Sequence, residues 1–542
     1  MTYQQVSGGD NIKNKDFIIK TFTFIANSIF INIFGKIFGM SNSIVAVSIV
    51  VIALTLVSID LTEGVVKKTF WLSMVTLILG VGASVANVNP VVGLLVNVSI
   101  IFCVVYQGIH NYKPHMYFPF ILAYIFMILS VPANFQELPI RMISIVVGCI
   151  YILLIQLVLN RNRFNKTMLG TKKAIIFNII NQVDSLIEEE YDSNLNTEID
   201  ALVDVSVKAI YDTRLKSKFI TSENKGKLDL VLALQKLGRA ISKAFNTKLL
   251  EEDEKKFLVK SKDILKLLDD YFYSDIDKNT VKKQINLCVK ELNMGIENKN
   301  IREIAQIIED IPKYLDVIES KDDKSRWNKD LAIKNSLKGI DTNTIAFRYA
   351  IKLSISIGIA IFLIDVCDLT YGRWIIFPMI SVIQPYYDGT VKKAFERIIG
   401  TVLGIILFTV LFTFVTDNTI RLNIIIFLAY INLFMKKYHI STSLVAVSAL
   451  GSVAMGGAGV EILGFRIGFT IAGCVIAIII NKYILHYTLE DYKTDLTIEY
   501  MDDMKELKDL DSTLQNEDKR YNLILKTKLM EYKIAQHSKN YS

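Results

Sequence analysis

The sequence predicts an all-α membrane protein in which two parallel six-helix transmembrane repeats are separated by a soluble helical cytoplasmic domain. Hydrophobic residues make up 51% of the 542 residues, and the mean hydropathy is +0.36. Charge is segregated, because residues 17–160 and 345–487 are mostly apolar whereas 161–340 and 488–542 are rich in Lys, Glu and Asp. Short motifs also recur between the two apolar parts at a constant spacing. A bilayer imposes such segregation, since an unpaired charge in hydrocarbon is costly.

Each apolar part is predicted to contain six helices. Several of the segments are shorter than the ~20 residues that an untilted span requires. The predicted domains are an N-terminal transmembrane repeat (1–160), a cytoplasmic helical domain (161–344), a C-terminal transmembrane repeat (345–487) and a cytoplasmic helical tail (488–542). The approximate segments are 17–38, 43–59, 70–87, 91–109, 117–132 and 140–159, then 346–364, 372–385, 398–416, 421–435, 440–457 and 463–486.

The region between the two apolar parts has the period of amphipathic helices. Residues 229–245, 255–273 and 301–318 place apolar side chains at i, i+3, i+4 and i+7. These stretches predict a soluble helical bundle. The charged tail is also predicted to be helical, over 500–510 and 521–534, and its short apolar stripe favours docking on that bundle.

The distribution of basic residues predicts the orientation in the membrane. The loops at 87–90 and 133–139 contain no Lys or Arg. The alternate loops and flanks are basic, and the positive-inside rule then places both termini and the insert in the cytoplasm of a multi-pass protein of the bacterial inner membrane. The basic positions are Lys13, Lys15, Lys20, Lys67, Lys68, Lys113, Arg161, Arg163 and Lys166 in the first half, and Lys392, Lys393, Arg397, Lys436 and Lys437 in the second.

The recurring motifs indicate an internal duplication. The pattern GxVKKxF begins at Gly64 and again at Gly389, and 389 − 64 = 325. The pattern RxxxxxxGC begins at Arg141 and again at Arg466, and 466 − 141 is also 325. We therefore interpret the two apolar parts as one six-helix unit used twice. Because six is even, both copies enter the bilayer from the same side and are predicted to be parallel.

The stretch from Trp374 to Gly404 contains the most specific motif of the chain. Its pattern W…P…QP…T…A…RxxGTxxG resembles the signature of the fusaric acid resistance and aromatic acid exporter superfamily, and the layout of the whole chain resembles that family too. The resemblance implies efflux of organic anions, often aromatic or other weak carboxylic acids, driven by the proton gradient. Plant malate channels share the layout, so an anion channel gated by the cytoplasmic domain is the alternative. The motif residues are Trp374, Pro378, Gln384, Pro385, Thr390, Ala394, Arg397, Gly400, Thr401 and Gly404.

The same stretch supplies the candidate substrate-binding residues. Pro378 and Pro385 interrupt a segment that is already short. Freed backbone groups in a membrane are tolerated where protein or a water-filled cavity satisfies them, and paired short helices in two repeats point to a transport site. Arg397 suits a carboxylate because its planar fork can bind both oxygens. The candidate set is Trp374, Gln384, Pro385, Asp388, Lys392, Lys393, Arg397 and Thr401, with Lys67 and Lys68 from the first half.

Plainer interpretations stand beside this one. Pro385 can simply end a helix, the cations can serve topology alone, and Asp388 and Glu396 can pair with them. The first half also lacks the arginine and glycines of the motif, since Leu72, Val75 and Leu79 stand at the positions of Arg397, Gly400 and Gly404. If the motif binds solute, the two repeats are not equivalent.

Two further sets of residues are assigned. Gly400 and Gly404 form a GxxxG motif, for which we predict close helix packing. Arg141 with Glu137, and Arg466 with Glu461, are predicted as charge pairs at the outer side, acting as a relay or as interfacial anchors. No Asp, Glu or His lies plainly in mid-span, which weakens a proton-coupled mechanism and leaves a channel or uniporter open.

Several functional classes lack sequence support. No P-loop and no catalytic constellation occurs, and the five cysteines form no CxxC pair, so we predict neither an enzyme nor a cofactor or metal. Acids accompany the bases of the insert, so nucleic acid is not an expected partner. The expected partners are the lipid bilayer, a small organic anion and a second copy in a dimer. An envelope adaptor protein is left open, as is a non-transporting membrane scaffold.

Overall fold

The computed structural model is helical throughout the part of the chain that it describes, and no strand occurs there. The described residues are 9–39, 42–56, 65–109, 117–129, 137–160, 162–188, 194–213, 220–245, 251–273, 277–293, 299–319, 342, 344–369, 371–415, 417–455, 461–510 and 517–539.

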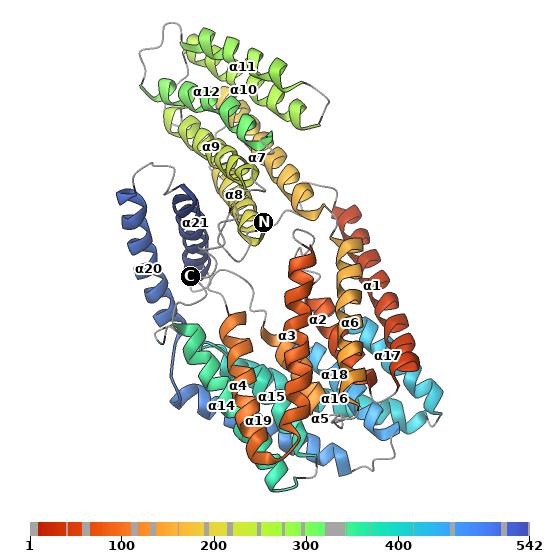
Figure 1. Ribbon diagram of the computed structural model, residues 1–542. Helices are drawn as coiled ribbons and strands as arrows, with labels where there is room; N and C mark the ends of the chain where they lie inside the picture. The colour runs from red at the N-terminus through yellow and green to blue at the C-terminus, as the bar shows by residue number, and fades with distance from the viewer. Residues whose placement is uncertain are drawn as a thin grey trace. The chain divides into compact units, whose positions relative to one another are not determined.

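The chain divides into two compact units. The apolar unit comprises residues 10–161 and 339–495, and the polar unit comprises 1–9, 162–338 and 496–542. Figure 1 shows each unit as a group of helices. The apolar unit contains α1 (Gly9–Phe38), α2 (Ser43–Leu56), α3 (Val65–Ala86), α4 (Pro90–Gly108), α5 (Tyr117–Leu129), α6 (Leu138–Leu159), α14 (Ile345–Val366), the 3-10 helix η2 (Gly372–Ile375), α15 (Ile376–Val382), α16 (Thr390–Phe414), α17 (Asn418–Asn432), α18 (Tyr438–Met455) and α19 (Glu461–Tyr483).

A helix lies in each of the twelve apolar segments expected from the sequence. Eight of the described helices are long and apolar enough to cross a bilayer, whereas α2, α5 and η2 with α15 are apolar but shorter. Capping explains several boundaries. Asn89 Oδ1 accepts from Val92 N at 2.8 Å ahead of Pro90, and Asp417 Oδ1 accepts from Thr419 N at 2.8 Å. Such caps satisfy backbone N–H groups that have no partner within the helix.

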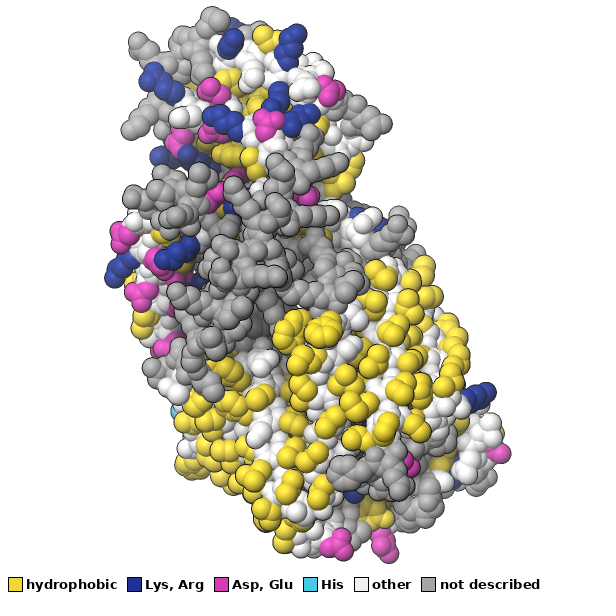
Figure 2. All heavy atoms as spheres, in the orientation of Figure 1, with side chains coloured by type: hydrophobic (Ala, Val, Ile, Leu, Met, Phe, Trp, Pro, Cys, Tyr) yellow, Lys and Arg dark blue, Asp and Glu magenta, His cyan; other side chains and the backbone are white. Residues whose placement is uncertain are grey.

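The outer surface of the apolar unit is hydrophobic. Exposed fractions reach 83% for Phe414, 68% for Ile37, 65% for Leu95 and 61% for Phe395. Figure 2 shows hydrophobic side chains covering the visible face of this unit, while Lys, Arg, Asp and Glu gather over the helices of the polar unit. An exposed apolar surface of this extent is what a helical bundle presents to lipid.

The two halves of the apolar unit pack corresponding helices together. In the first half α6 contacts α3 and α2, and in the second half α19 contacts α16 and α15. Likewise α5 contacts α3 and α4, and α18 contacts α16 and α17. The starts of α3 at Val65 and α16 at Thr390 differ by 390 − 65 = 325 residues, the spacing of the sequence motifs. The arrangement as two parallel repeats stays a prediction, which these shared pairings support.

The first helix of each half contacts the fourth helix of the other half. α14 packs closely on α4, where a Cβ built on Gly358 would lie 2.5 Å from Val98 Cγ2. α1 reaches α17 through Thr21, whose hydroxyl lies 2.8 Å from that of Tyr430, and through the Phe24–Tyr430 ring pair at 5.1 Å. The two halves are therefore interleaved.

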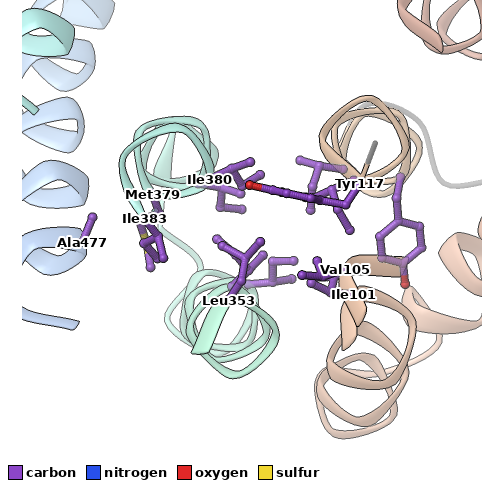
Figure 3. Packing of buried hydrophobic residues seen from close by; sticks show 14 of the residues in the cluster. Ile101, Val105, Tyr117, Leu353, Met379, Ile380, Ile383 and Ala477 are labelled. Carbon is purple, nitrogen blue, oxygen red and sulfur yellow. The ribbon is translucent and has the colours of Figure 1, made fainter. Parts of the chain in front are cut away.

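A buried core joins the halves. It comprises side chains from α4, α5, α14, α15 and α19. Figure 3 shows Leu353 of α14 facing Ile101 and Val105 of α4, with Tyr117 of α5 beside them. The Tyr117 and Tyr349 hydroxyls lie 2.8 Å apart, and Tyr349 donates to Ile383 O at 3.0 Å. This core fixes α15 against both halves.

The glycines of the GxxxG motif face α18. A Cβ on Gly400 would lie 2.6 Å from His439 O, and one on Gly404 would lie 2.6 Å from Ala446 Cβ. The structure therefore places both glycines at a close helix crossing, where the missing side chains let the backbones approach.

The polar unit is a helical bundle. It contains α7 (Arg163–Ile187), α8 (Asn194–Thr213), α9 (Ser222–Phe245), α10 (Glu252–Tyr273), α11 (Lys278–Asn293), α12 (Lys299–Glu319) and α21 (Glu517–Lys539), and α20 (Leu489–Asp509) enters it from Leu496 onward. The three stretches of helical periodicity lie in α9, α10 and α12. The tail helix α21 packs on α8, and Tyr521 donates a short hydrogen bond to Asp229 of α9.

Asp204 of α8 gives the polar unit a pH dependence. Burial, followed by the charge of Asp200, raises the pKa of Asp204 to about 7. The folded state therefore binds this proton more tightly than the unfolded state. Protonation of Asp204 stabilises the fold fully below pH 4, and the stabilisation is lost as pH rises from 4 through 7. We expect Asp204→Asn to stabilise the full chain by about 1 to 2 kcal/mol at pH 8 and by little at pH 4, after discounting for solvent screening. Thermal unfolding at both values measures this, and an equal shift at both would contradict it.

Candidate anion site

The motif stretch forms a broken helix between α14 and α16. The 3-10 helix η2 leads into α15, which has only seven residues and ends at Val382. Residues 383–389, the α15–α16 loop, include the buried Pro385, and α16 begins at Thr390. α19 packs closely on this broken helix, because a Cβ on Gly473 would lie 2.6 Å from Ile375 O. The break therefore lies inside protein.

Arg466 of α19 lies buried against the broken helix. Arg466 is only 5% exposed, and its guanidinium carbon lies 4.0 Å from the centroid of the Trp374 ring. Its Nε and Nη1 atoms are buried and have no hydrogen-bond acceptor among the residues described. A buried guanidinium in this state carries a large desolvation cost that the ring repays only in part.

Arg397 of α16 brings a second positive charge near Arg466. Arg397 is half-buried, its Nε is buried without a described acceptor, and its charge acts on both Arg466 and Cys474. Within the described part of the chain, neither arginine forms an ion pair with a carboxylate. Two like charges that are partly withdrawn from water repel each other and attract an anion.

Lys352 of α14 is a further cation near α16 and α19, and the sequence analysis did not select it. It is 2% exposed, and its Nζ donates to Asn481 Oδ1 of α19 at 3.0 Å. Asn481 Nδ2 in turn donates a short hydrogen bond to Thr390 Oγ1 at the start of α16. No charged group among the described residues acts on Lys352.

These three cations occupy successive levels along α16 and α19. Lys352 lies level with Asn481 and Thr390. Arg397 follows Thr390 by seven residues (397 − 390), and Arg466 precedes Asn481 by fifteen (481 − 466). At the rise of an α-helix the two arginine Cα atoms are roughly 10 Å and 22 Å beyond the Lys352 level. We call Lys352, Arg397 and Arg466 the cation column.

The other predicted site residues lie around this column with separate contacts. Lys392 is exposed, and Lys393 Nζ lies 5.5 Å from the Tyr438 ring centroid. Thr401 is buried, and its hydroxyl donates to Arg397 O at 2.9 Å. Gln384 Nε2 donates to Ser381 O at 3.4 Å.

One of the plainer interpretations was that Asp388 pairs with the motif's cations. In the described structure Asp388 forms no such ion pair. Its Oδ2 accepts from Leu489 N at 2.7 Å, and so it caps the start of α20. The side chains of Lys67 and Lys68 lie outside the described residues.

The two outer arginines have different surroundings. Arg141 is 1% exposed, its Nε donates to Asn42 Oδ1 at 3.3 Å, and Glu137 acts on it electrostatically. Glu461 is exposed and, in the described structure, forms no ion pair with Arg466. Arg466 instead faces Trp374, which is 92 residues away in sequence (466 − 374).

No group of three or more His, Cys, Asp or Glu among the described residues could hold a metal ion. The arrangement therefore offers charge and an aromatic face, which together can bind and pass an organic anion.

Comparison with known proteins gives matches concentrated in parts of the chain. ORF2, an uncharacterized protein of Neisseria gonorrhoeae, is 33% identical over 136 residues, which are 24% of this chain and 32% of that protein. The inner membrane protein YccS of Escherichia coli is 26% identical over 179 residues, which are 32% of this chain and 24% of that protein. The matches thus span under a third of these relatives. No solved structure matches.

A family model described as fusaric acid resistance protein-like matches residues 359–480. That range contains Trp374, Arg397 and Arg466, and it runs from within α14 to near the end of α19. The resemblance inferred from the motif is confirmed: residues 359–480 of this chain are similar to the fusaric acid resistance protein-like family.

Proposed function

We propose that this protein exports organic anions across the bacterial inner membrane through the cation column. The observation that carries the proposal is Arg466, which is buried against the Trp374 ring and has two nitrogens without an acceptor among the described residues. The charge of Arg397, a half-buried residue whose Nε also has no described acceptor, acts on it. A bound carboxylate would supply the missing negative charge and accept from the free guanidinium N–H groups. The similarity to YccS, an inner membrane protein, supports an inner-membrane location.

Aromatic carboxylic acids fit this site best. The face of Trp374 is next to Arg466, and Phe377 lies nearby with its ring centroid 6.3 Å from that of Trp374. An aromatic acid can place its carboxylate on the guanidinium and its ring against these side chains. We propose cytoplasmic termini and a dimer on topology and symmetry grounds, and an envelope adaptor protein is left for experiment to decide.

The energy source distinguishes two forms of the proposal. The family resemblance implies drive by the proton gradient. The fixed charges of the column favour the second form, an anion channel, because arginine does not release its proton in proteins. An inside-negative potential would itself expel an anion through such a column.

Flux measurements test the proposal. Full-length protein in liposomes, loaded with labelled benzoate or with an aliphatic carboxylate, is compared as native chain, Arg397→Ala and Lys436→Ala. Lys436 is the control because it is exposed and is not one of the candidate binding residues. We expect Arg397→Ala to reduce benzoate flux by at least about 30-fold, the cost of losing a desolvated charge partner, and Lys436→Ala to leave it nearly unchanged.

The outcomes separate the candidate functions. Flux that needs Arg397 and stops when an uncoupler is added supports a proton-driven exporter. Flux that needs Arg397, ignores the uncoupler and follows voltage supports the channel. No flux for any acid, in a chain that is folded by gel filtration, would leave the membrane scaffold as the function.

A further inference from the structure

The buried lysine Lys352 is held by one amide. Its Nζ donates to Asn481 Oδ1 of α19, and its backbone oxygen accepts from the Ser356 hydroxyl within α14. An ammonium group has three donors. At 2% exposure, Lys352 is therefore a charged group that a carboxylate could satisfy but cannot reach while the surrounding contacts hold.

Asn481 also holds the α15–α16 loop. Its Nδ2 donates to Thr390 Oγ1, where the loop ends, and donates to Tyr386 O at 3.5 Å inside the loop. One amide side chain thus bridges the buried lysine and the loop. Displacing the loop removes two of the partners that orient this amide.

The start of α20 holds the same loop from its other side. Asp388 Oδ2 accepts from Leu489 N at 2.7 Å, and Tyr387 N donates to Tyr487 O at 3.0 Å. The Tyr386 ring lies 5.1 Å from the Tyr492 ring, between centroids. These contacts join residues about a hundred positions apart, and Asp388 is exposed, so its bond is the most accessible to competition by water.

We propose that the α15–α16 loop is a gate, that Asp388 latches it to α20, and that Lys352 is the first binding site for an organic carboxylate when the gate opens. Lys352 lies at the end of the cation column near Lys392 and Lys393, the end that is cytoplasmic in the proposed topology. The carboxylate role rests on the proposed function, whereas the gate does not. Groups near the latch include Arg348, over the Tyr487 ring at 5.5 Å, and Asp495, which accepts from the Tyr487 hydroxyl at 2.6 Å.

The test reads the reactivity of the native lysine. Purified full-length protein in detergent is reductively methylated with formaldehyde and a borohydride, and the modification of Lys352 is followed by mass spectrometry. We compare the native chain with Asp388→Ala, which removes the latch, and with Asp388→Asn, which keeps an acceptor oxygen. Glu490→Ala is the control, because Glu490 is an exposed acid one residue beyond Leu489.

We expect roughly ten-fold faster methylation of Lys352 in Asp388→Ala, with the native rate kept in Glu490→Ala and largely restored in Asp388→Asn. Benzoate should slow the reaction in Asp388→Ala.

A rate unchanged by Asp388→Ala overturns the gate, whatever the flux measurements show. A faster rate that benzoate leaves unchanged overturns Lys352 as the carboxylate site. Gel filtration and thermal unfolding identify a variant that has lost its fold, in which lysines throughout the chain react together. If Asp388→Ala is such a variant, Tyr386→Leu, which removes the ring contact with Tyr492, takes its place in the same comparison.

Discussion

Replacing Arg466 with methionine is expected to make the protein more stable and to abolish its anion flux. Arg466 is 95% buried and has two N–H-bearing nitrogens without an acceptor in the described structure. Arg397 adds repulsion. An apolar side chain of similar volume removes both penalties, and replacements of buried charges of this kind can stabilise by about 1 to 4 kcal/mol. The contact with the Trp374 ring lost on substitution is worth roughly 2 kcal/mol or less, so the net effect stays favourable.

The loss of flux follows from the same charge. If a carboxylate binds between Arg397 and Arg466, removing one desolvated partner costs about 2 to 5 kcal/mol of binding, or at least roughly a 30-fold loss of flux. Thermal unfolding in detergent and flux in liposomes are both measured on one preparation. A gain in stability with lost flux identifies a charge retained for function at the expense of stability.

Arg421 provides a control of opposite sign. Its Nε donates to Val415 O at 2.7 Å and its Nη2 to Phe412 O at 3.4 Å, so it satisfies carbonyls at the end of α16. Arg421→Met should destabilise the protein by about 1 to 3 kcal/mol and leave the flux per folded molecule unchanged. If Arg466→Met also destabilises and flux persists, Arg466 is a structural residue packed on Trp374, and the proposed site is wrong.

The sequence was sufficient for the helices and for half of the site. Apolar length and turn residues marked the segments, because a helix in lipid must satisfy its own backbone. The motif selected Trp374 and Arg397. It did not pair Trp374 with Arg466, since a contact across 92 residues depends on how α19 crosses α15. The sequence analysis paired Arg466 with Glu461 instead, from proximity along the chain.

Lys352 and Asp388 show two other limits. A single lysine in an apolar segment is usually interpreted as a charge near a helix end. The offset of 325 residues between the repeats nevertheless indicates that position 352 is a polar packing position. Position 27 (352 − 325) is Asn27, which accepts from the Tyr151 hydroxyl at 2.7 Å, so both first helices place a polar side chain there against the sixth. Asp388 could not be assigned as a cap, because its partner Leu489 is 101 residues away (489 − 388).

The second large effect is expected at Gly473, where α19 crosses the broken helix. A Cβ there would lie 2.6 Å from Ile375 O and 3.1 Å from Pro378 Cβ. A backbone oxygen and a proline ring cannot change rotamer to make room for the new methyl group, so α19 must move. We expect Gly473→Ala to destabilise the protein by about 1 to 3 kcal/mol in thermal unfolding. Flux should fall as well, because Arg466 lies seven residues away on the same helix and would shift from Trp374.

Two glycines complete a graded series. A Cβ on Gly468, also in α19, meets nothing within 4 Å, so Gly468→Ala should stabilise by up to about 1 kcal/mol through helix propensity. For a Cβ on Gly148, the counterpart of Gly473 (473 − 325), the three nearest atoms all belong to the side chain of Ile49, the nearest at 2.6 Å. Because that side chain can change rotamer, Gly148→Ala should cost less than Gly473→Ala. Equal destabilisation by Gly148→Ala and Gly473→Ala would mean that the neighbouring atoms move aside at both helix crossings. It would contradict the inference that the α19 crossing is rigid and holds Arg466 at a fixed distance from Trp374.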